Sequence, residues 1–377
     1  MQTKKILLLC VTSQNVFTFR RGLIKELQQN DLDVSVVAFD EDYKCEIEKM
    51  GVDFYCIQDK NRSTNPLKIL SLQKKYYELI YQISPDIVFT FMLKPNIFGV
   101  MAAKQAGVKD IYSMVEGAGD VFINNSLKWK IVRFVVCKLY KHAFKHSQKI
   151  FFLNTDDKEE FINRHLLKAE QCEIIHGIGV DLQKFAYAPI KNTRTFLMIA
   201  RMLKTKGVLE YCKCARLVKK QYPDAIFNYL GSEGNIKIAD IQEYIDDGSI
   251  NYLGITKDVR PYLEDCTVFV LPSSYREGLP MSIMEAEAIG RAIITTDNVG
   301  CRETVVNGYN GFLVECKNYQ QMAEKSIYMI ENSKTTLQFG ENSRKFAEEH
   351  FDHTKINKKI YGFIVNNSFK KEFYLHN

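Results

Sequence analysis

Residues 268–297 read VFVLPSSYREGLPMSIMEAEAIGRAIITTD and place three structural elements in one short unit. A buried strand is predicted in VFVLPS, a helix over residues 281–289, and a second buried strand in AIITTD. Strand, helix and strand in series are typical of a parallel sheet with helices on its faces. This unit therefore predicts an α/β fold of the doubly wound type.

The same alternation runs along most of the 377 residues. Before residue 155, strands are predicted in the apolar runs KILLLCV, DVSVVAF, DIVFTFM, DIYSMV and KIFFLN, with amphipathic stretches between them. In the second half, TFLMIA, AIFNYLG, INYLG and GFLVE add further strands. The chain is expected to form two doubly wound Rossmann-like domains.

The join between the halves is predicted in residues 176–195, HGIGVDLQKFAYAPIKNTRT, which contain two glycines and a proline and show no sustained periodicity. We expect an N-terminal domain over residues 1–185, a second domain over 186–355, and a C-terminal helix over 356–377 that crosses back to the first domain. In such a pair the favoured binding place is the cleft between the domains, at the carboxyl ends of the strands.

Composition narrows the function classes. Hydrophobic residues make up 46% of the chain and charged residues 25%, as in soluble globular proteins. The net charge of +6 fits anionic partners such as phosphates or an acidic membrane surface, and no zinc-finger or RNP signature points to nucleic acid. The ten cysteines include no Cys-x-x-Cys pair, which argues against a structural zinc site. No apolar stretch approaches the length of a membrane span, so we expect a cytoplasmic protein.

The loop before the helix at 281–289 has the chemistry of an anion site. Pro280 suits a helix start because its missing N–H would be unpaired there, and the N–H groups from Gly278 onward would then face a bound diphosphate. Arg201 and Lys206 directly follow the strand TFLMIA, where cations suit diphosphate oxygens. Each residue alone is more often a solvated charge, but jointly they indicate a phosphate site.

Several motifs follow in order along the second half: ARMLKTKG, LGSEG, LGITKDVRPYLEDCTVFVLPS, REGLPMSIMEAEAIGRAIITTD and GCRETVVNGYNGFLV. With these motifs and the linker HGIGVDLQKF, the chain resembles the retaining glycosyltransferases of family 4, which have the GT-B fold. The resemblance covers essentially the whole chain. It implies that Arg201 and Lys206 bind the nucleotide diphosphate and that Glu285 binds the ribose hydroxyls.

The same resemblance implies the rest of the donor site. Glu277 would contact the donor sugar, with the backbone N–H groups of Gly278 and Leu279 beside it. The nucleotide base would lie near Thr256 and Lys257.

The first half carries the expected acceptor side. SMVEGAGD places Glu116 at a predicted strand end, where many family members have His-Gly. This departure resembles the bacterial N-acetylgalactosaminyltransferases of lipid-linked glycan assembly. We expect Glu116 near the reacting centre, holding a donor hydroxyl or orienting the acceptor; the alternative is an exposed loop acid. The first loop lacks the family's Gly-Gly pair, so Ser13, Gln14 or Asn15 could contact the donor instead.

The resemblance implies transfer of a hexose or N-acetylhexosamine, first of all GalNAc, from a UDP-sugar to a lipid-linked saccharide in bacterial surface polysaccharide or glycan synthesis. It implies retention through front-face attack, with no metal or other cofactor, and a catalytic set of Glu116, Arg201, Lys206 and Glu277. Asp31 and Asp33 precede a strand and are interpreted as a turn.

Two rival functions remain open. The first is a UDP-sugar epimerase of the same architecture, and the second is a nucleotide-sugar-binding protein without turnover. A dinucleotide dehydrogenase is excluded because no Gly-x-Gly-x-x-Gly follows a strand.

Residues 127–146 predict a basic amphipathic helix. At about 100° per residue, one side gathers Lys130, Lys138, Lys141 and Lys145, and the other gathers Val132, Val136, Leu139 and Ala143. With Trp129 near its start, this helix could rest on an anionic membrane or be an ordinary surface helix. A peripheral position on the inner face of the cell membrane is therefore compatible with the sequence.

Overall fold

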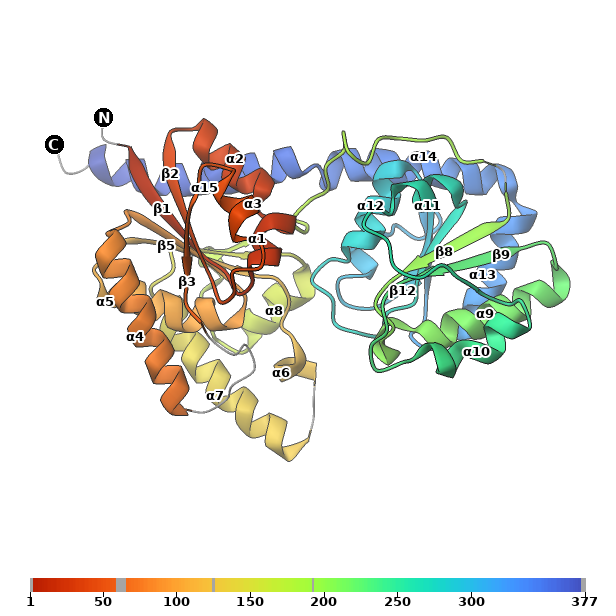
Figure 1. The fold of residues 1–377 in the computed structure, drawn as a ribbon, viewed down its shortest axis with the longest axis horizontal. Coiled ribbons are helices and arrows are strands. Elements are labelled where there is room, and N and C mark those ends of the chain that lie inside the picture. Colours follow the sequence, from red (N-terminus) through yellow and green to blue (C-terminus); the bar gives the residue numbers. More distant parts are fainter. Residues whose placement is uncertain (1–2, 59–65, 124–125, 192, 374–377) are drawn as a thin grey trace. The chain divides into compact units, whose positions relative to one another are not determined.

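The structure is a computed structural model that describes residues 3–58, 66–123, 126–191 and 193–373. The chain folds into two compact units, one formed by Met1–Ile178 with Thr354–Asn377 and the other by Gly179–His353 (Figure 1). The chain passes from the first unit to the second between Ile178 and Gly179. This point lies inside the expected linker, but before the expected boundary between residues 185 and 186. The shift has a local cause, since Val180 already donates its N–H to the Phe351 carbonyl (2.7 Å) and Phe185 is buried in the core of the second unit.

The first unit contains a parallel sheet in the order β3-β2-β1-β4-β5-β6-β7. Its strands are β1 (Lys4–Leu9), β2 (Leu32–Ala38), β3 (Asp53–Cys56), β4 (Ile87–Phe91), β5 (Asp110–Val115), β6 (Lys149–Phe152) and β7 (Cys172–Ile174). The strands predicted from long apolar runs are all present. The edge strands β3 and β7 were not predicted, because they are short and mostly only half-buried.

Helices cover both faces of this sheet. They are α1 (Ser13–Phe19), α2 (Arg21–Gln29), α3 (Lys44–Glu48), α4 (Pro66–Ile83), η1 (Pro95–Gly99), α5 (Val100–Gln105), α6 (Asp120–Ile123), α7 (Leu127–Phe144), α8 (Thr155–Asn163), η2 (Ala169–Gln171) and the C-terminal α15 (His353–Phe373). Alternate residues of β1 enter different cores: Leu7 and Leu9 lie in one cluster, Ile6 and Leu8 in another. Ile360 and Ile364 of α15 belong to the second of these clusters.

The second unit has a parallel sheet in the order β10-β9-β8-β11-β12-β13. Its strands are β8 (Thr195–Ile199), β9 (Ile226–Leu230), β10 (Asn251–Tyr252), β11 (Val268–Leu271), β12 (Ala292–Thr296) and β13 (Gly311–Val314). Its helices are η3 (Lys204–Lys206), α9 (Val208–Gln221), α10 (Ile238–Asp246), α11 (Arg260–Asp265), α12 (Met281–Ile289), η4 (Arg302–Thr304), α13 (Tyr319–Glu331) and α14 (Ser333–His350). Every strand predicted in this half is present, and the doubly wound α/β class is confirmed.

Strand order in the second unit identifies where a ligand should bind. The chain runs from β8 outward through β9 to β10 and then returns to the other side of β8 with β11. Open α/β sheets bind ligands at the carboxyl ends of strands next to such a reversal. The loops after β8 and β11 therefore form the natural binding edge. In the first unit the corresponding reversal lies between β1 and β4.

Candidate active site

Lys206 is brought to the end of β11 by a close approach of two loops. It ends the short helix η3, and Gly207 follows with a φ of 78°. A Cβ on Gly207 would collide with the carbonyl oxygen of Pro272, so only glycine lets the turn after β8 pack against the loop after β11. Ser274 strengthens this junction by donating its N–H to the Thr205 carbonyl (2.7 Å).

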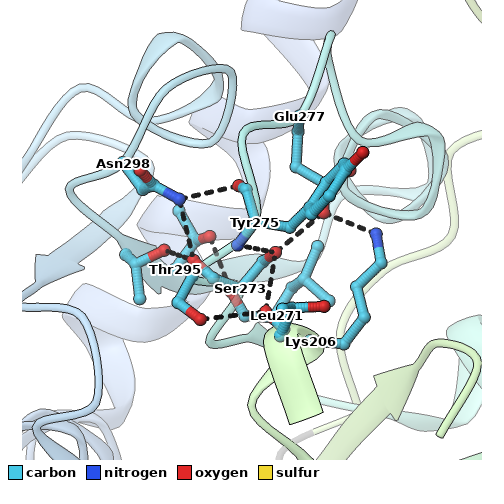
Figure 2. A network of polar contacts seen from close by, with 10 residues as sticks. Lys206, Leu271, Ser273, Tyr275, Glu277, Thr295 and Asn298 are labelled. Atoms are coloured by element: carbon cyan, nitrogen blue, oxygen red, sulfur yellow. Dashed lines mark hydrogen bonds and ion pairs between the residues drawn. The ribbon is translucent and has the colours of Figure 1, made fainter. Parts of the chain in front are cut away.

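The side chains of Lys206, Ser273 and Glu277 converge in this junction (Figure 2). Lys206 Nζ lies 2.5 Å from Glu277 Oε1, and Ser273 Oγ donates to the same oxygen over 2.7 Å. The side chains of Lys206 and Glu277 are 22% and 12% exposed, so the pair is screened from most solvent but still reachable. A cation and an oriented carboxylate thus stand side by side at the reversal of the sheet.

The end of β12 and the loop that follows it hold the backbone of this cluster in place. Asn298 Nδ2 donates to the carbonyls of Tyr275 (2.7 Å) and Ser273 (3.4 Å) (Figure 2). Thr296 Oγ1 donates to the Ser273 carbonyl (2.5 Å). Gly300 has a φ of 78°, and a Cβ there would lie 2.5 Å from the Glu277 carbonyl oxygen. The backbone that carries Glu277 is therefore held by contacts with the turn after β8 and with the loop after β12.

Helix α12 begins at Met281, directly beyond Glu277. Pro280 is its N-cap residue with a ψ of 114°, and α12 spans Met281–Ile289, the range predicted for this helix. The first N–H groups of any helix lack partners within that helix, and here they follow Gly278 and the buried Leu279. Those N–H groups make the start of α12 suited to an anion.

Glu285 and Glu287 lie on the same helix in different surroundings. Glu285 is half-buried, and burial raises its pKa to about 7 while Lys184 acts in the opposite direction. Glu287 is fully buried and accepts a hydrogen bond from Asn310 Nδ2 (2.8 Å); burial holds its pKa well above the ordinary value. Glu285 alone of this pair has a surface that a ligand could reach.

The remaining predicted donor residues lie along the same edge of the sheet. Arg201 follows β8, is exposed, and donates from Nε to the Glu233 carbonyl (3.4 Å). Thr256 lies in the loop after β10, where its hydroxyl bonds the Asp258 carbonyl (2.9 Å) and N–H (3.1 Å), and Lys257 beside it is exposed. Hydrogen bonds join Lys206, Ser273 and Glu277 into one compact cluster. Ser273 and Asn298 were not singled out from the sequence, although Ser273 lies inside the opening motif.

Glu116 is not an isolated loop acid. It follows β5 in the first unit and forms an ion pair with the guanidinium of Arg20, whose side chain is 4% exposed. That guanidinium lies 4.3 Å from the centre of the Phe91 ring at the end of β4, and burial lowers the pKa of Arg20 to about 10, with Cys10 opposing the shift. Arg20 was not identified from the sequence, where it is one of two adjacent arginines in an amphipathic pattern.

The loop after Glu116 is also fixed. Ala118 donates its N–H to Oδ2 of Asp157 (3.1 Å), a fully buried carboxylate that Asn154 Nδ2 also contacts (3.2 Å). The Glu116 carboxylate thus has an ion-pair partner on one side and a tethered backbone on the other.

The first loop differs from the sequence expectation at Ser13. Its side chain is buried, and Oγ donates to Asp40 and accepts the N–H of Tyr43 (3.0 Å). Ser13 therefore holds the loop to the end of β2 and is corrected from a candidate donor contact to a structural residue. Gln14 is exposed, and Asn15 is half-buried with Nδ2 3.4 Å from the Met92 sulfur.

Comparison with known families identifies both halves. Residues 180–346 match the family described as glycosyl transferases group 1, and residues 5–154 match the family described as glycosyl transferase 4-like. The chain is a glycosyltransferase of these families. The two matches fall on the two units that carry the Lys206 cluster and the Arg20–Glu116 pair.

Relatives with named activities align over most of the chain. A Campylobacter jejuni protein, the N,N'-diacetylbacillosaminyl-diphospho-undecaprenol alpha-1,3-N-acetylgalactosaminyltransferase, is 29% identical over 369 residues, 94% of this chain and 97% of its own. An Escherichia coli UDP-Gal:alpha-D-GlcNAc-diphosphoundecaprenol alpha-1,3-galactosyltransferase is 28% identical over 317 residues, 79% of this chain and 80% of its own.

Solved structures share the fold. Anabaena HepE in complex with UDP superposes with a TM-score of 0.79 at 18% identity, covering 96% of this chain and all of its own. A glycosyltransferase from Rickettsia africae gives a TM-score of 0.77 at 19% identity, over 97% of this chain and 100% of its own. These likenesses confirm the expected GT-B architecture of two Rossmann-like domains.

Proposed function

We propose that the chain transfers a hexose or N-acetylhexosamine, GalNAc first among them, from a UDP-sugar to a saccharide carried on a lipid diphosphate. The observation that carries this proposal is the cluster of Lys206, Ser273 and Glu277 beside the start of α12. A cation and a helix start suit a diphosphate, and the adjoining carboxylate suits sugar hydroxyls. The Campylobacter and Escherichia relatives are named for acceptors on diphospho-undecaprenol, which supports the acceptor class.

Each donor residue then has a role matched to its position. Lys206, the α12 start and Arg201 bind the diphosphate, and Glu277, with the backbone at Gly278 and Leu279, holds the sugar. Glu285 accepts the ribose hydroxyls, and the loop of Thr256 and Lys257 flanks the base. Charge that develops on the leaving diphosphate is met by groups already fixed in place, which is the main way such sites lower a reaction barrier.

The proposed transfer retains the anomeric configuration and uses no metal. Both named relatives make α-1,3 linkages, and an α-linked UDP-sugar yields an α-linkage by retention. Front-face attack, with the leaving diphosphate taking the acceptor proton, needs no protein nucleophile. Lys206 and the α12 start supply the positive charge that a metal would otherwise provide at the leaving group.

The first unit is proposed to serve the acceptor. Glu116 would orient the attacking hydroxyl, since Arg20 and the Ala118–Asp157 bond hold it in place. A lipid-linked acceptor would bring the protein to the inner face of the cell membrane as a peripheral protein, with helix 127–146 as the contact. No helix within the described residues is long and apolar enough to cross a membrane.

In the decisive experiment, the protein is incubated with each of a panel of UDP-sugars and with a synthetic saccharide on a polyprenyl diphosphate. Transfer from one donor, with the product anomer assigned by NMR, is expected, and addition of EDTA should leave the rate unchanged. Interconversion of UDP-sugars without an acceptor would instead establish an epimerase. Donor binding without turnover on any acceptor would establish a binding protein.

A further inference from the structure

The solvent-facing side of α7 is apolar in its first half. Leu127 is 76% exposed, Ile131 60%, Phe134 60% and Val135 49%. Because residues four, seven and eight positions apart share one face of a helix, these side chains form a continuous stripe. The opposite side packs into the first unit through the buried Tyr140, Ala143 and Phe144. The expected division into a basic outer face and an apolar inner face is therefore incomplete.

The same outward face becomes basic in its second half. Lys138, Lys141 and Lys145 are exposed and continue the line of Phe134 and Ile131. Lys138 Nζ lies 4.5 Å from the centre of the Phe134 ring, so the two halves adjoin. Residues 127–146 contain no aspartate or glutamate. The face thus joins an exposed apolar stripe to positive charge that no acid on the helix offsets.

We infer that α7 docks on an anionic lipid bilayer by partial insertion. The apolar stripe of Leu127, Ile131, Phe134 and Val135 enters the boundary between headgroups and acyl chains, and the three lysines contact lipid phosphates. An exposed apolar stripe flanked by cations has the chemistry of an interfacial helix, and the charge selects acidic lipids. This inference rests on the proposed function only for its use, which is to bring the protein to a lipid-linked acceptor.

A tryptophan on the stripe allows docking to be measured without a label. Trp129 is the only tryptophan in the chain, but it lies about 200° around α7 from Leu127 and therefore away from the stripe. The reporter is therefore the variant Trp129→Phe with Phe134→Trp, which moves the tryptophan onto the stripe. The full-length protein is mixed with vesicles of phosphatidylcholine alone or with 30 mol% phosphatidylglycerol (about one anionic lipid in three, enough to attract basic segments). We expect binding to the anionic vesicles only, a blue shift of the tryptophan emission of the reporter variant, and quenching of that emission by lipids brominated on their acyl chains.

Three variants separate the contribution of apolar insertion to vesicle binding from the contribution of positive charge. Ile131→Gln with Phe134→Gln should weaken vesicle binding about tenfold or more, because two apolar side chains no longer leave water. Lys138→Glu with Lys141→Glu should weaken binding in a salt-dependent manner. Ile226→Gln is the matched control, since Ile226 is an exposed isoleucine (42%) on β9 of the second unit, and it should bind like the wild type.

The controls also distinguish this inference from the proposed function. All variants should keep the wild-type thermal shift with UDP, which reports on the donor site and on folding. Vesicle binding of the reporter variant without a blue shift, or undiminished binding of the Ile131→Gln, Phe134→Gln variant, would overturn the insertion. A dimeric mass in light scattering that this variant converts to a monomer would assign the stripe to a second copy instead. Absence of any response to UDP, with vesicle binding intact, would count against the proposed function alone.

Discussion

The carboxylate of Glu116 is held by the guanidinium of Arg20, a buried cation that enters from the junction of α1 and α2. Both groups lie at the carboxyl edge of the first sheet, close to the reversal between β1 and β4. A buried cation that loses its partner is costly, so each residue fixes the other. The pair makes Glu116 a preorganised group, and Arg20 a positioning residue for it.

This pairing predicts coupled losses of activity. Glu116→Gln should lower kcat about a hundredfold while leaving the KM for the donor nearly unchanged. Arg20→Met should give a similar loss, and Arg20→Lys should restore part of it. In a double-mutant cycle, Arg20→Met should add little to Glu116→Gln. Fully additive effects would show that Arg20 acts on folding rather than through Glu116.

Gly300 predicts a steric effect on the donor loop. Gly300→Ala places a Cβ 2.5 Å from the Glu277 carbonyl at a φ of 78°, so the loop must shift or strain by about 1–3 kcal/mol. UDP affinity, measured by calorimetry, should fall. Gly308→Ala is the matched control, because Gly308 has a φ of 79° and nothing within 4 Å of its Cβ position. Equal effects of the two substitutions would mean that backbone strain, and not the contact with Glu277, is responsible.

From the position of Lys206 we predict that nucleotide binding depends on the positive charge of its side chain. Lys206→Ala should weaken UDP binding by about ten- to a hundredfold, the size expected for a charge-assisted hydrogen bond. Affinity for uridine, which lacks the diphosphate, should hardly change. Lys204→Ala removes an exposed cation from the same turn and should leave both affinities near wild type. A loss of uridine binding in Lys206→Ala would indicate a general collapse of the site.

Glu285 predicts a pH dependence of nucleoside binding. Burial raises its pKa to about 7, so its carboxyl is mainly protonated at pH 6 and mainly ionised at pH 8. The ionised form can accept a hydrogen bond from a ribose hydroxyl at each of its oxygens, whereas the protonated form carries a donor on one of them. Uridine affinity should therefore rise between pH 6 and pH 8, by at most about tenfold per pH unit. Glu285→Gln should remove this rise; a pH-independent affinity in the wild type would rule out the ribose role.

From the burial of Glu287 we predict that its contribution to the free energy of unfolding falls as pH rises. Its pKa lies well above the ordinary 4.5 in the folded chain, so the folded form retains a proton that the unfolded form loses above about pH 4.5. Each pH unit in this window lowers the free energy of unfolding by up to about 1.4 kcal/mol. Glu287→Gln should flatten this slope in denaturant titrations at pH 5, 6 and 7. Glu324→Gln, on the exposed side of α13, should leave the slope unchanged.

The sequence predicted the fold well because long apolar runs are the strands of a sheet buried on both faces. The short edge strands β3 and β7 lack such runs, and that signal could not find them. Candidate site residues could be proposed where a chemical pattern is local, as in the loop from Glu277 to Pro280. The partner of Glu116 was not predictable, because the Arg20 contact depends on how β1, β4 and β5 are ordered in the sheet.

Within α12, sequence spacing alone could not show which glutamate faces a ligand and which faces the core. Glu285 and Glu287 are two positions apart, about 200° around a helix, so one must face away from the other. The resemblance to family 4 indicated the first as the ribose contact, whereas the burial of the second depends on Asn310 and the core around it.

The path of the chain has a consequence for its biosynthesis. The second unit is one unbroken segment, and Val180 near its beginning is hydrogen bonded to Phe351 near its end. In topological terms it is an insertion within the first unit. During synthesis it is completed before α15 emerges, whereas the first unit must wait for Ile360 and Ile364 to close its core. The unit that begins first is thus the last to finish folding.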